Sequence, residues 1–481
     1  MREKPLDRLT FGLLIVCFSI LLLLPQNLKA ATFVAVGDPL YDSYAFLEAA
    51  GCLRSALLTL KPISRVESLR LAQEASLLCS QKGPVFQEHL KRIKQLLMYQ
   101  PQLSYLRPID GFSGHFCGVD LDEPFFAKRF YYRRGEALKH GVNYRFSLKT
   151  RAEGQRLSFF LESSWEESGN GKRLFSPEGY VVLTGKPLSF LIGRLSQWWG
   201  PGAGGSLLLT NSPYPFDLLL FTNEKPWLLG GWLARMAFFV TKLEKSRPIP
   251  RPYLWGARLV LKPRPWLEMG LSRTALLGGE GRSSSLKTWW RSFLGKGENV
   301  GKGSAREPGD QRFSIDLKLT GVSHRQPFQV YFEVGREHLV EKILHEWAYL
   351  LGLYLPVLGP WPELSLRLEY THTPSNWGVH YLYRGGYTYH GFPIGHHLFK
   401  KGRSFWGRLS YQLPRLRAET TCFFELSRSD LQGRENRFGF RMRFFVSKGY
   451  FSLKTGYFSF RHPAGRRDEG FWVGGGFSLF W

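Results

Sequence analysis

The chain ends in the stretch GFWVGGGFSLFW, which runs from Gly470 to Trp481. Counted back from the terminus, every second residue is apolar or glycine: Trp481, Leu479, Phe477, Gly475, Val473 and Phe471. A period of two predicts a β-strand with one apolar face. An exposed apolar edge makes a soluble protein prone to aggregation, whereas a membrane-spanning strand turns such a face to lipid. The buried final strand of a soluble β-sandwich is the alternative interpretation.

The same alternation recurs through the preceding sequence. In RFSIDLKLT, Arg312–Thr320, apolar residues alternate with polar and charged ones, and LSLRLEYT, Leu364–Thr371, and RFGFRMRFF, Arg437–Phe445, repeat the pattern. We count about sixteen to eighteen such segments of roughly ten residues, the length of a tilted membrane strand. The sequence therefore predicts an all-β transmembrane barrel of antiparallel strands over residues 107–481.

The second face of these strands carries charges of both signs. We expect the following residues to point into the barrel: Arg258, Asp316, Lys318, Glu333, Arg367, Glu369, Arg408, Glu419, Glu425, Arg437 and Arg441. Opposite charges at this density can pair across the interior and narrow it. We therefore expect a partly filled lumen rather than a wide aqueous pore.

The composition excludes several classes of protein. Of 481 residues, 15% are aromatic, 51 are glycine and five are cysteine, and the mean hydropathy is −0.21. The many aromatic residues exclude a disordered chain, and the lack of a G-X-Y repeat excludes collagen. Five cysteines are too few for a disulfide scaffold. The low hydropathy argues against a bundle of membrane helices.

Residues 1–30 predict a secretory signal peptide. The basic start MREKPLDR precedes an apolar run from Leu9 to Leu24, and small residues follow at Ala30 and Ala31. A permanent membrane anchor is the alternative for so short a run. The mature chain is thus expected to begin near Ala31, outside the cytoplasm. Export makes nucleic acid an unsuitable partner for the formal net charge of +26, so we predict no nucleic-acid binding.

Residues 31–106 are predicted to form a small helical bundle in the periplasm. Ser64 and Glu67 have the spacing of a capping box at the start of an apolar-periodic segment. A second helical candidate follows in PVFQEHLKRIKQLLMY. Cys52 and Cys79 both fall in this region, and either a disulfide between them or two buried thiols fits the sequence.

The longest turn region is residues 278–310, GGEGRSSSLKTWWRSFLGKGENVGKGSAREPGD. Outer-membrane barrels keep their periplasmic turns short and their outer loops long, so we place this loop on the cell exterior. A disordered spacer is the alternative. Trp289, Trp290 and Phe293 nevertheless indicate that part of the loop packs or binds something.

Motifs that would bind cofactors or metals fail on their details. GPGAGG, Gly200–Gly205, lacks the strand and helix that flank a dinucleotide loop, and GENVGKGS has Gly303 where a P-loop needs Ser or Thr. The His345–Glu346 pair lacks the second histidine of a zinc site. Four further histidines are crowded but fit no standard ligand spacing: His380, His390, His396 and His397. We therefore predict no enzyme, no cofactor and no metal, and interpret these histidines as loop or interfacial residues.

Two stretches resemble the Wzi-type capsule-assembly family of outer-membrane proteins. The first is GRLSQWWGPGAGGSLLLTNSPYPFDLLLF, in which the matching residues are Trp199, Gly200, Pro201, Gly202, Gly205, Ser206, Leu207, Leu208 and Asn211. The second is SNWGVHYLYRGGYTYHGFPIGHH, which is similar to a late Tyr/His/Gly-rich segment of that family. The start of the PISRVE helix is also similar. The resemblance extends at least from Asp42 to Trp481.

The resemblance implies an eighteen-stranded barrel in the bacterial outer membrane, with a helical bundle at its periplasmic mouth. It also implies a non-catalytic role in holding capsular or other extracellular polysaccharide at the cell surface. Such a barrel would contact outer-membrane lipid and lipopolysaccharide. The aromatic final strand is of the kind that barrel-assembly machinery recognises during insertion.

Sugars bind to aromatic faces and hydrogen-bonding side chains, and acidic sugars also require Arg or Lys. In the exterior loop we single out Lys287, Trp289, Trp290 and Arg291 as candidates for polysaccharide contact, with Lys296 and Lys302 nearby. The alternative is an interfacial aromatic girdle with basic residues on lipopolysaccharide phosphates. For the family motif, Trp199–Gly205 with Asn211, we expect a structural role because Gly and Pro shape tight turns.

Two other functions remain open to the sequence. A diffusion channel would need a continuous water path through the barrel. A lipid-modifying barrel enzyme, such as an outer-membrane phospholipase, would need a serine–histidine pair, and the sequence offers no convincing one.

Overall fold

The structure is a computed structural model that describes residues 31–95, 105–121, 134–169, 171–295, 309–337, 347–430 and 433–481. The predicted signal peptide, the GENVGKGS motif, Lys296, Lys302 and the His345–Glu346 pair lie outside these ranges.

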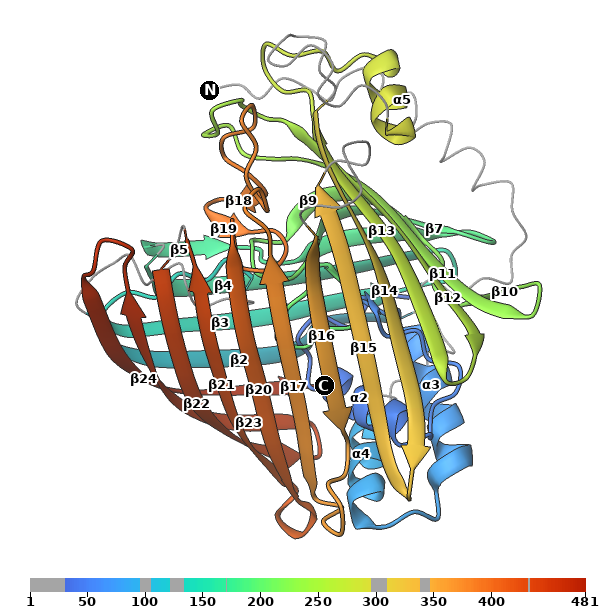
Figure 1. The fold of residues 1–481 in the computed structure, drawn as a ribbon. Coiled ribbons are helices and arrows are strands. Elements are labelled where there is room, and N and C mark those ends of the chain that lie inside the picture. The colour runs from blue at the N-terminus through green and yellow to red at the C-terminus, as the bar shows by residue number, and fades with distance from the viewer. Residues whose placement is uncertain are drawn as a thin grey trace.

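Eighteen antiparallel strands in these ranges close into a barrel (Figure 1). They are β2 (Tyr105–Leu121), β3 (Gly141–Glu153), β4 (Leu157–Ser168), β6 (Gly179–Thr184), β7 (Ser189–Leu195), β9 (Phe216–Thr222), β11 (Trp232–Lys242), β12 (Tyr253–Arg264), β13 (Leu267–Leu277), β14 (Gly309–Ser323), β15 (Gln326–Glu337), β16 (Ala348–Leu355), β17 (Leu364–Thr373), β20 (Gly402–Leu413), β21 (Ala418–Ser429), β22 (Gly433–Val446), β23 (Gly449–Arg461) and β24 (Arg467–Phe480). The last strand pairs with the first, with Phe477 opposite Gly114. The predicted fold class is confirmed.

Shorter strands supplement the barrel. β5 (Gly171–Phe175) extends the wall beside β4, and β10 (Trp227–Leu229) forms a hairpin with β11. Two further pairs lie outside the barrel sheet: β1 (Leu60–Lys61) with β8 (Trp198–Trp199), and β18 (Thr388–Tyr389) with β19 (Phe392–Pro393).

The period of two in the sequence separates the outer face of the barrel from its lumen. In β24, Phe471 and Val473 are 60% and 64% exposed, whereas Trp472 between them is 6% exposed. In β14, Ile315 is exposed and Asp316 is buried. The outer face is thus the apolar surface expected of strands that cross a bilayer.

The two ends of the barrel differ. At one end most turns are short, such as residues 265–266 and 324–325, and at the other end the connections include residues 196–215, 278–308 and 374–401. Helix α5 (Leu286–Leu294) lies at the long-loop end, opposite α3 (Arg65–Cys79) and α4 (Pro84–Gln95) in Figure 1. None of the helices in the described ranges is long and apolar enough to cross a membrane.

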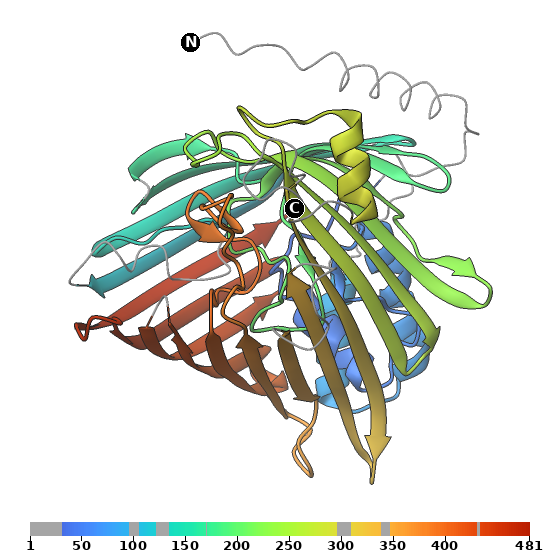
Figure 2. The same ribbon diagram turned by 45° about the horizontal axis from the view of Figure 1, so that its top comes forward.

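The N-terminal segment enters the barrel from the short-turn end. Helix α2 (Leu40–Ala49) packs on α4 and lies against β14 and β15 inside the wall (Figure 2). The Ser64 hydroxyl accepts a hydrogen bond from the Glu67 amide at 3.1 Å, as the capping box predicts. A disulfide joins Cys52 to Cys79, so of the two alternatives the disulfide is the one observed.

Candidate functional site

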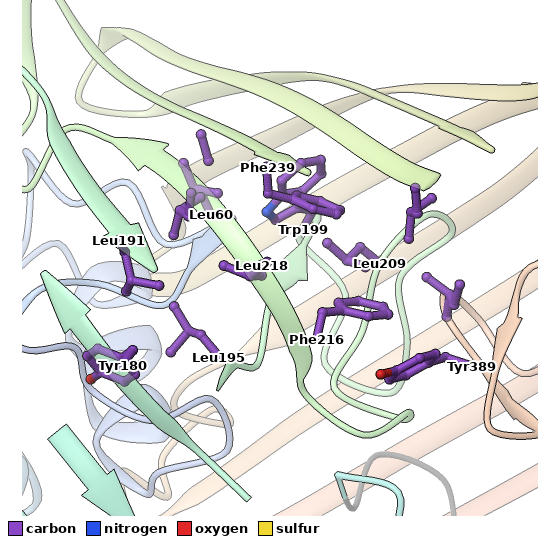
Figure 3. Close-up of a cluster of buried hydrophobic side chains, with 14 of the residues drawn as sticks. Leu60, Tyr180, Leu191, Leu195, Trp199, Leu209, Phe216, Leu218, Phe239 and Tyr389 are labelled. Carbon is purple, nitrogen blue, oxygen red and sulfur yellow. The ribbon is translucent and has the colours of Figure 1, made fainter. Parts of the chain in front are cut away.

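The Trp-Gly-Pro-Gly motif lies deep in the lumen rather than at the surface. Trp199 is completely buried, and its ring centroid lies 5.3 Å from that of Phe239. Figure 3 shows Trp199 beside Leu209 and near Phe216, within an apolar cluster. Trp199 also belongs to β8, which pairs with β1, so the motif contacts the N-terminal segment directly.

Two buried carboxylates on the barrel wall hold the backbone of this motif. The amides of Ala203 and Gly204 donate to Glu369 at 2.6 and 2.9 Å. The amide of Leu207 donates to Glu333 at 3.1 Å. These two carboxylates were among those expected to point inward, and both are at most 2% exposed. The motif residues in the described structure therefore shape a turn inside the barrel.

The second long connection, residues 374–401, folds onto the first. The Thr210 amide donates to the Ile394 carbonyl at 2.8 Å. The Arg312 guanidinium carbon lies 3.4 Å from the centroid of the Tyr387 ring, whose hydroxyl donates to the Asp310 carbonyl at 3.0 Å. Both loops thus pack across the lumen.

Below these loops, ion pairs fill the barrel. Arg258 contacts Asp316 at 2.7 Å with both side chains inaccessible to solvent. Glu48 of α2 accepts from Lys262 of β12 at 2.9 Å and from Lys318 of β14 at 2.7 Å. These contacts confirm the expectation of a partly filled lumen.

The N-terminal segment is also held by contacts to its backbone. Arg235, 1% exposed, donates to the carbonyls of Leu57, Leu60 and Pro62 at 3.0 to 3.3 Å. Sequence reasoning missed this arginine and Glu48, because nothing in a local pattern indicates a partner about 175 to 270 residues away along the chain.

The candidate residues of the exterior loop lie on helix α5, which packs on the outer wall of the barrel. The Trp255 indole N–H donates to the Ser292 hydroxyl at 2.9 Å, and Arg273 donates to the carbonyls of Ser292 and Phe293 near the end of the helix. Trp289 lies edge-on to Tyr253, with ring centroids 5.4 Å apart.

The remaining candidates on α5 face solvent. Trp290 is 65% exposed, and Lys287 and Arg291 are also exposed. Trp289 is half-buried and packs against the rings of Tyr253 and Phe293. The loop therefore presents one free aromatic ring between two cations.

The four late histidines do not form a metal site in the described residues, where no group of three His, Cys, Asp or Glu side chains could hold an ion. Three of them are buried, at positions 380, 396 and 397, and His390 is exposed. His397 lies 3.0 Å from Glu425. Burial and its neighbour His397 lower the pKa of His396 well below its usual value.

The structure does bring one serine to a histidine that the sequence did not connect. His89 Nδ1 lies 3.1 Å from the Ser43 hydroxyl, inside the helical segment. The other ring nitrogen is buried without a hydrogen-bond partner in the described structure, whereas a catalytic histidine needs a carboxylate there. Burial, with a smaller contribution from Arg92, lowers the pKa of His89 to about 3. The pair lacks the third member of a hydrolytic triad.

Comparison with known proteins gives three findings. Residues 125–464 match the family described as capsule assembly protein Wzi. A Klebsiella pneumoniae protein, described as an uncharacterized 55.8 kDa protein in the cps region, is 32% identical over 164 residues, which cover 32% of this chain and 31% of that protein. The match thus spans about a third of the relative's length.

The third finding is structural. Escherichia coli Wzi, described as an outer-membrane protein involved in group 1 capsule assembly and a carbohydrate-binding β-barrel, has a TM-score of 0.73 and 17% identity. The superposition covers 94% of this chain and 100% of that chain, and it confirms the fold. Because the family match covers well over half of the residues, the chain belongs to the capsule assembly protein Wzi family.

Proposed function

We propose that this chain is a non-catalytic outer-membrane barrel that attaches or helps to assemble capsular or other extracellular polysaccharide at the cell surface. The observation that carries the proposal is the family match over residues 125–464. The carbohydrate-binding description of the E. coli protein, whose fold is the same, supports it.

The contents of the lumen favour this function over a diffusion channel. A channel needs a polar, water-filled path along the barrel axis. Here the N-terminal segment enters from one end and residues 196–215 from the other, and they meet where Leu60 pairs with Trp199. Buried ion pairs such as Arg258–Asp316 lie on the barrel wall near this pairing of Leu60 with Trp199.

A lipid-modifying enzyme receives less support. The serine–histidine contact described above, Ser43 with His89, is buried among helices, and its second ring nitrogen has no carboxylate partner in the described residues. A polysaccharide attached at the surface needs no covalent step.

The long-loop end is the face that we propose to meet polysaccharide. Long loops of outer-membrane barrels point away from the cell, which supports a proposed orientation with α5 outside and the helices α3 and α4 in the periplasm. In this orientation the exposed Trp290 can stack on a sugar face, and Lys287 and Arg291 can pair with acidic groups. The chain would reach this site by way of its predicted signal peptide and barrel-assembly machinery.

The test measures glycan binding and bilayer conductance on one preparation of detergent-folded protein, with polysaccharide extracted from the surface of the producing cell. The test variant is K287E/W290A/R291E. We expect saturable binding and negligible conductance for the wild type, and about a tenfold weaker binding for the variant, which corresponds to the loss of ~1.4 kcal/mol.

The matched control places the same changes at the opposite rim. R415E/L416A/K448E reverses two exposed charges and removes one exposed apolar side chain at the short-turn end, and it should bind like the wild type. Clear conductance without binding would make the protein a channel and overturn the proposal. Binding by the wild type with no loss in the α5 variant would move the site to another surface of the barrel.

A further inference from the structure

Five arginines form one row across the outer face of the barrel at its long-loop end. Strand register places Arg403 opposite Arg428, Arg428 opposite Arg434, Arg434 opposite Arg461, and Arg461 opposite Arg467. The row crosses the adjacent strands β20 to β24, and all five side chains are exposed. Directly opposite residues lie about 5 Å apart, so the row is roughly 20 Å long.

Four members of this row have no anionic partner in the described part of the chain. Arg467 pairs with Glu469 at 2.8 Å, but no carboxylate forms an ion pair with Arg403, Arg428, Arg434 or Arg461 in the described ranges. Like charges directly opposite each other on a sheet repel. An anion bridging the row would relieve that repulsion.

Some other cations at this end of the outer wall are paired with carboxylates. Arg194 donates to both oxygens of Asp217 at 2.8 Å. On the neighbouring side, Glu167 accepts from Lys139 at 2.7 Å and lies 3.5 Å from Lys172. The row differs from these cations because four of its five adjacent arginines lack such a partner in the described ranges.

Apolar side chains continue directly below the row on the same outer face. Phe405 and Leu426 lie two residues further along β20 and β21, and both are about 40% exposed. A groove of about 730 Å³ runs over these strands and is lined by all four unpaired arginines together with Phe405 and Leu426. Asp430 is the single carboxylate in that lining.

We propose that this row binds the phosphorylated headgroup of a lipid in the outer leaflet. Arginine forms bidentate hydrogen bonds with phosphate, and adjacent arginines at strand spacing fit a headgroup with more than one phosphate. The apolar residues below the row would contact the acyl chains. An acidic polysaccharide matches the charge but not this apolar surface, so the geometry favours a lipid. The inference does not depend on the proposed polysaccharide function.

The test uses the folded full-length protein in a neutral detergent and measures the affinity for purified lipopolysaccharide that lacks O-polysaccharide. The variant R403Q/R428Q/R434Q/R461Q should bind at least about tenfold more weakly. Enzymatic removal of the phosphates from the lipopolysaccharide should weaken wild-type binding to a similar degree. The variant removes repulsion, so we expect it to fold.

A matched control removes four exposed cations at the short-turn end, K225Q/R264Q/R415Q/K448Q, and should retain wild-type affinity. If the fourfold variant does not fold, the pairs R403Q/R434Q and R428Q/R461Q replace it, each with a loss of about threefold. Heat-modified mobility on gels verifies folding in every case.

Three outcomes would overturn the proposal. The first is unchanged affinity in the arginine variants. The second is full competition by inorganic phosphate at the concentration of the lipid, which would make the row a site for free anions. The third is binding of an acidic polysaccharide, and not of the lipid, that is lost in the arginine variants.

Discussion

Glu48 links helix α2 of the N-terminal segment to two lysines of the barrel wall. Its replacement by glutamine tests how strongly this contact holds the segment in the lumen. Its carboxylate accepts from Lys262 at 2.9 Å and Lys318 at 2.7 Å, and all three residues are at most 5% exposed. E48Q keeps the length of the side chain and removes its charge. Two lysines on the barrel wall then lose a shared anion.

The two lysines are not affected equally. Lys318 keeps its ion pair with Glu268 at 2.6 Å. Lys262 keeps a hydrogen bond to the Ala56 carbonyl at 2.7 Å and a weaker electrostatic attraction to Glu268. Removing one partner of a buried ion pair costs about 3–5 kcal/mol. This energy corresponds to roughly a hundredfold to several thousandfold increase in the population of the undocked segment, with the lower end expected because the glutamine oxygen can still accept one hydrogen bond.

The assay is hydrogen exchange of the amides of α2, residues 40–49, in the detergent-folded protein. Local opening governs this exchange. The protection factors should therefore fall by the same factor by which the population of the undocked segment rises. E280Q is the control, because Glu280 is exposed in a loop at the far end of the barrel, and it should leave α2 protection unchanged.

A second substitution makes the reasoning refutable. In E48Q/K262M the lysine that lost its ion pair with Glu48 is replaced by an apolar side chain of similar length, which removes the buried charge left without that ion pair. We expect at least half of the lost protection to return. Unchanged protection of the α2 amides in E48Q would refute the charge argument. It would also be refuted if the double variant lost as much further protection as E48Q lost relative to the wild type.

Three further predictions concern other parts of the molecule. C79S removes the disulfide to Cys52 and should destabilise the helical segment by about 3–4 kcal/mol, measured by exchange of α3, as expected for a loop of this size. His89 is neutral in the fold with a pKa of about 3, below that of an unfolded histidine. Its contribution to stability is therefore full above about pH 6.5 and lost as pH falls toward 3. The variant H89Q should therefore make the hydrogen exchange of the helices less dependent on pH in that range. G204A places a methyl group 2.5 Å from the Trp406 ring and should lower the unfolding free energy by about 1–3 kcal/mol in urea titration of the reconstituted barrel.

Features set by neighbouring residues could be predicted from the sequence. The alternation of Phe471 and Trp472 between outside and inside needs only the period of a strand, and the Ser64 cap needs only a spacing of three. The inward orientation of Asp316 follows in the same way. These are local consequences of backbone geometry, and the structure confirms them.

Features that depend on strand register or on packing between distant segments could not be predicted from the sequence. Each strand from β20 to β24 has an outward-facing arginine near its long-loop end, and only the register aligns them in one row. Whether Cys52 and Cys79 form a disulfide also could not be predicted, because it depends on how the end of α3 packs against the turn that follows α2. The orientation of the Trp199 motif, which turns into the lumen, follows from acceptors on β15 and β17.

The burial of this motif has a consequence for function within the family. Trp199 is inaccessible to solvent, and the amides beside it are taken up by Glu333 and Glu369. This motif therefore takes part in closing the lumen. Under the proposed function, contact with the polysaccharide is made by exposed side chains such as Trp290. Under this proposal, substitutions among the exposed side chains would change sugar recognition and leave the closed barrel intact, because different residues determine the two properties.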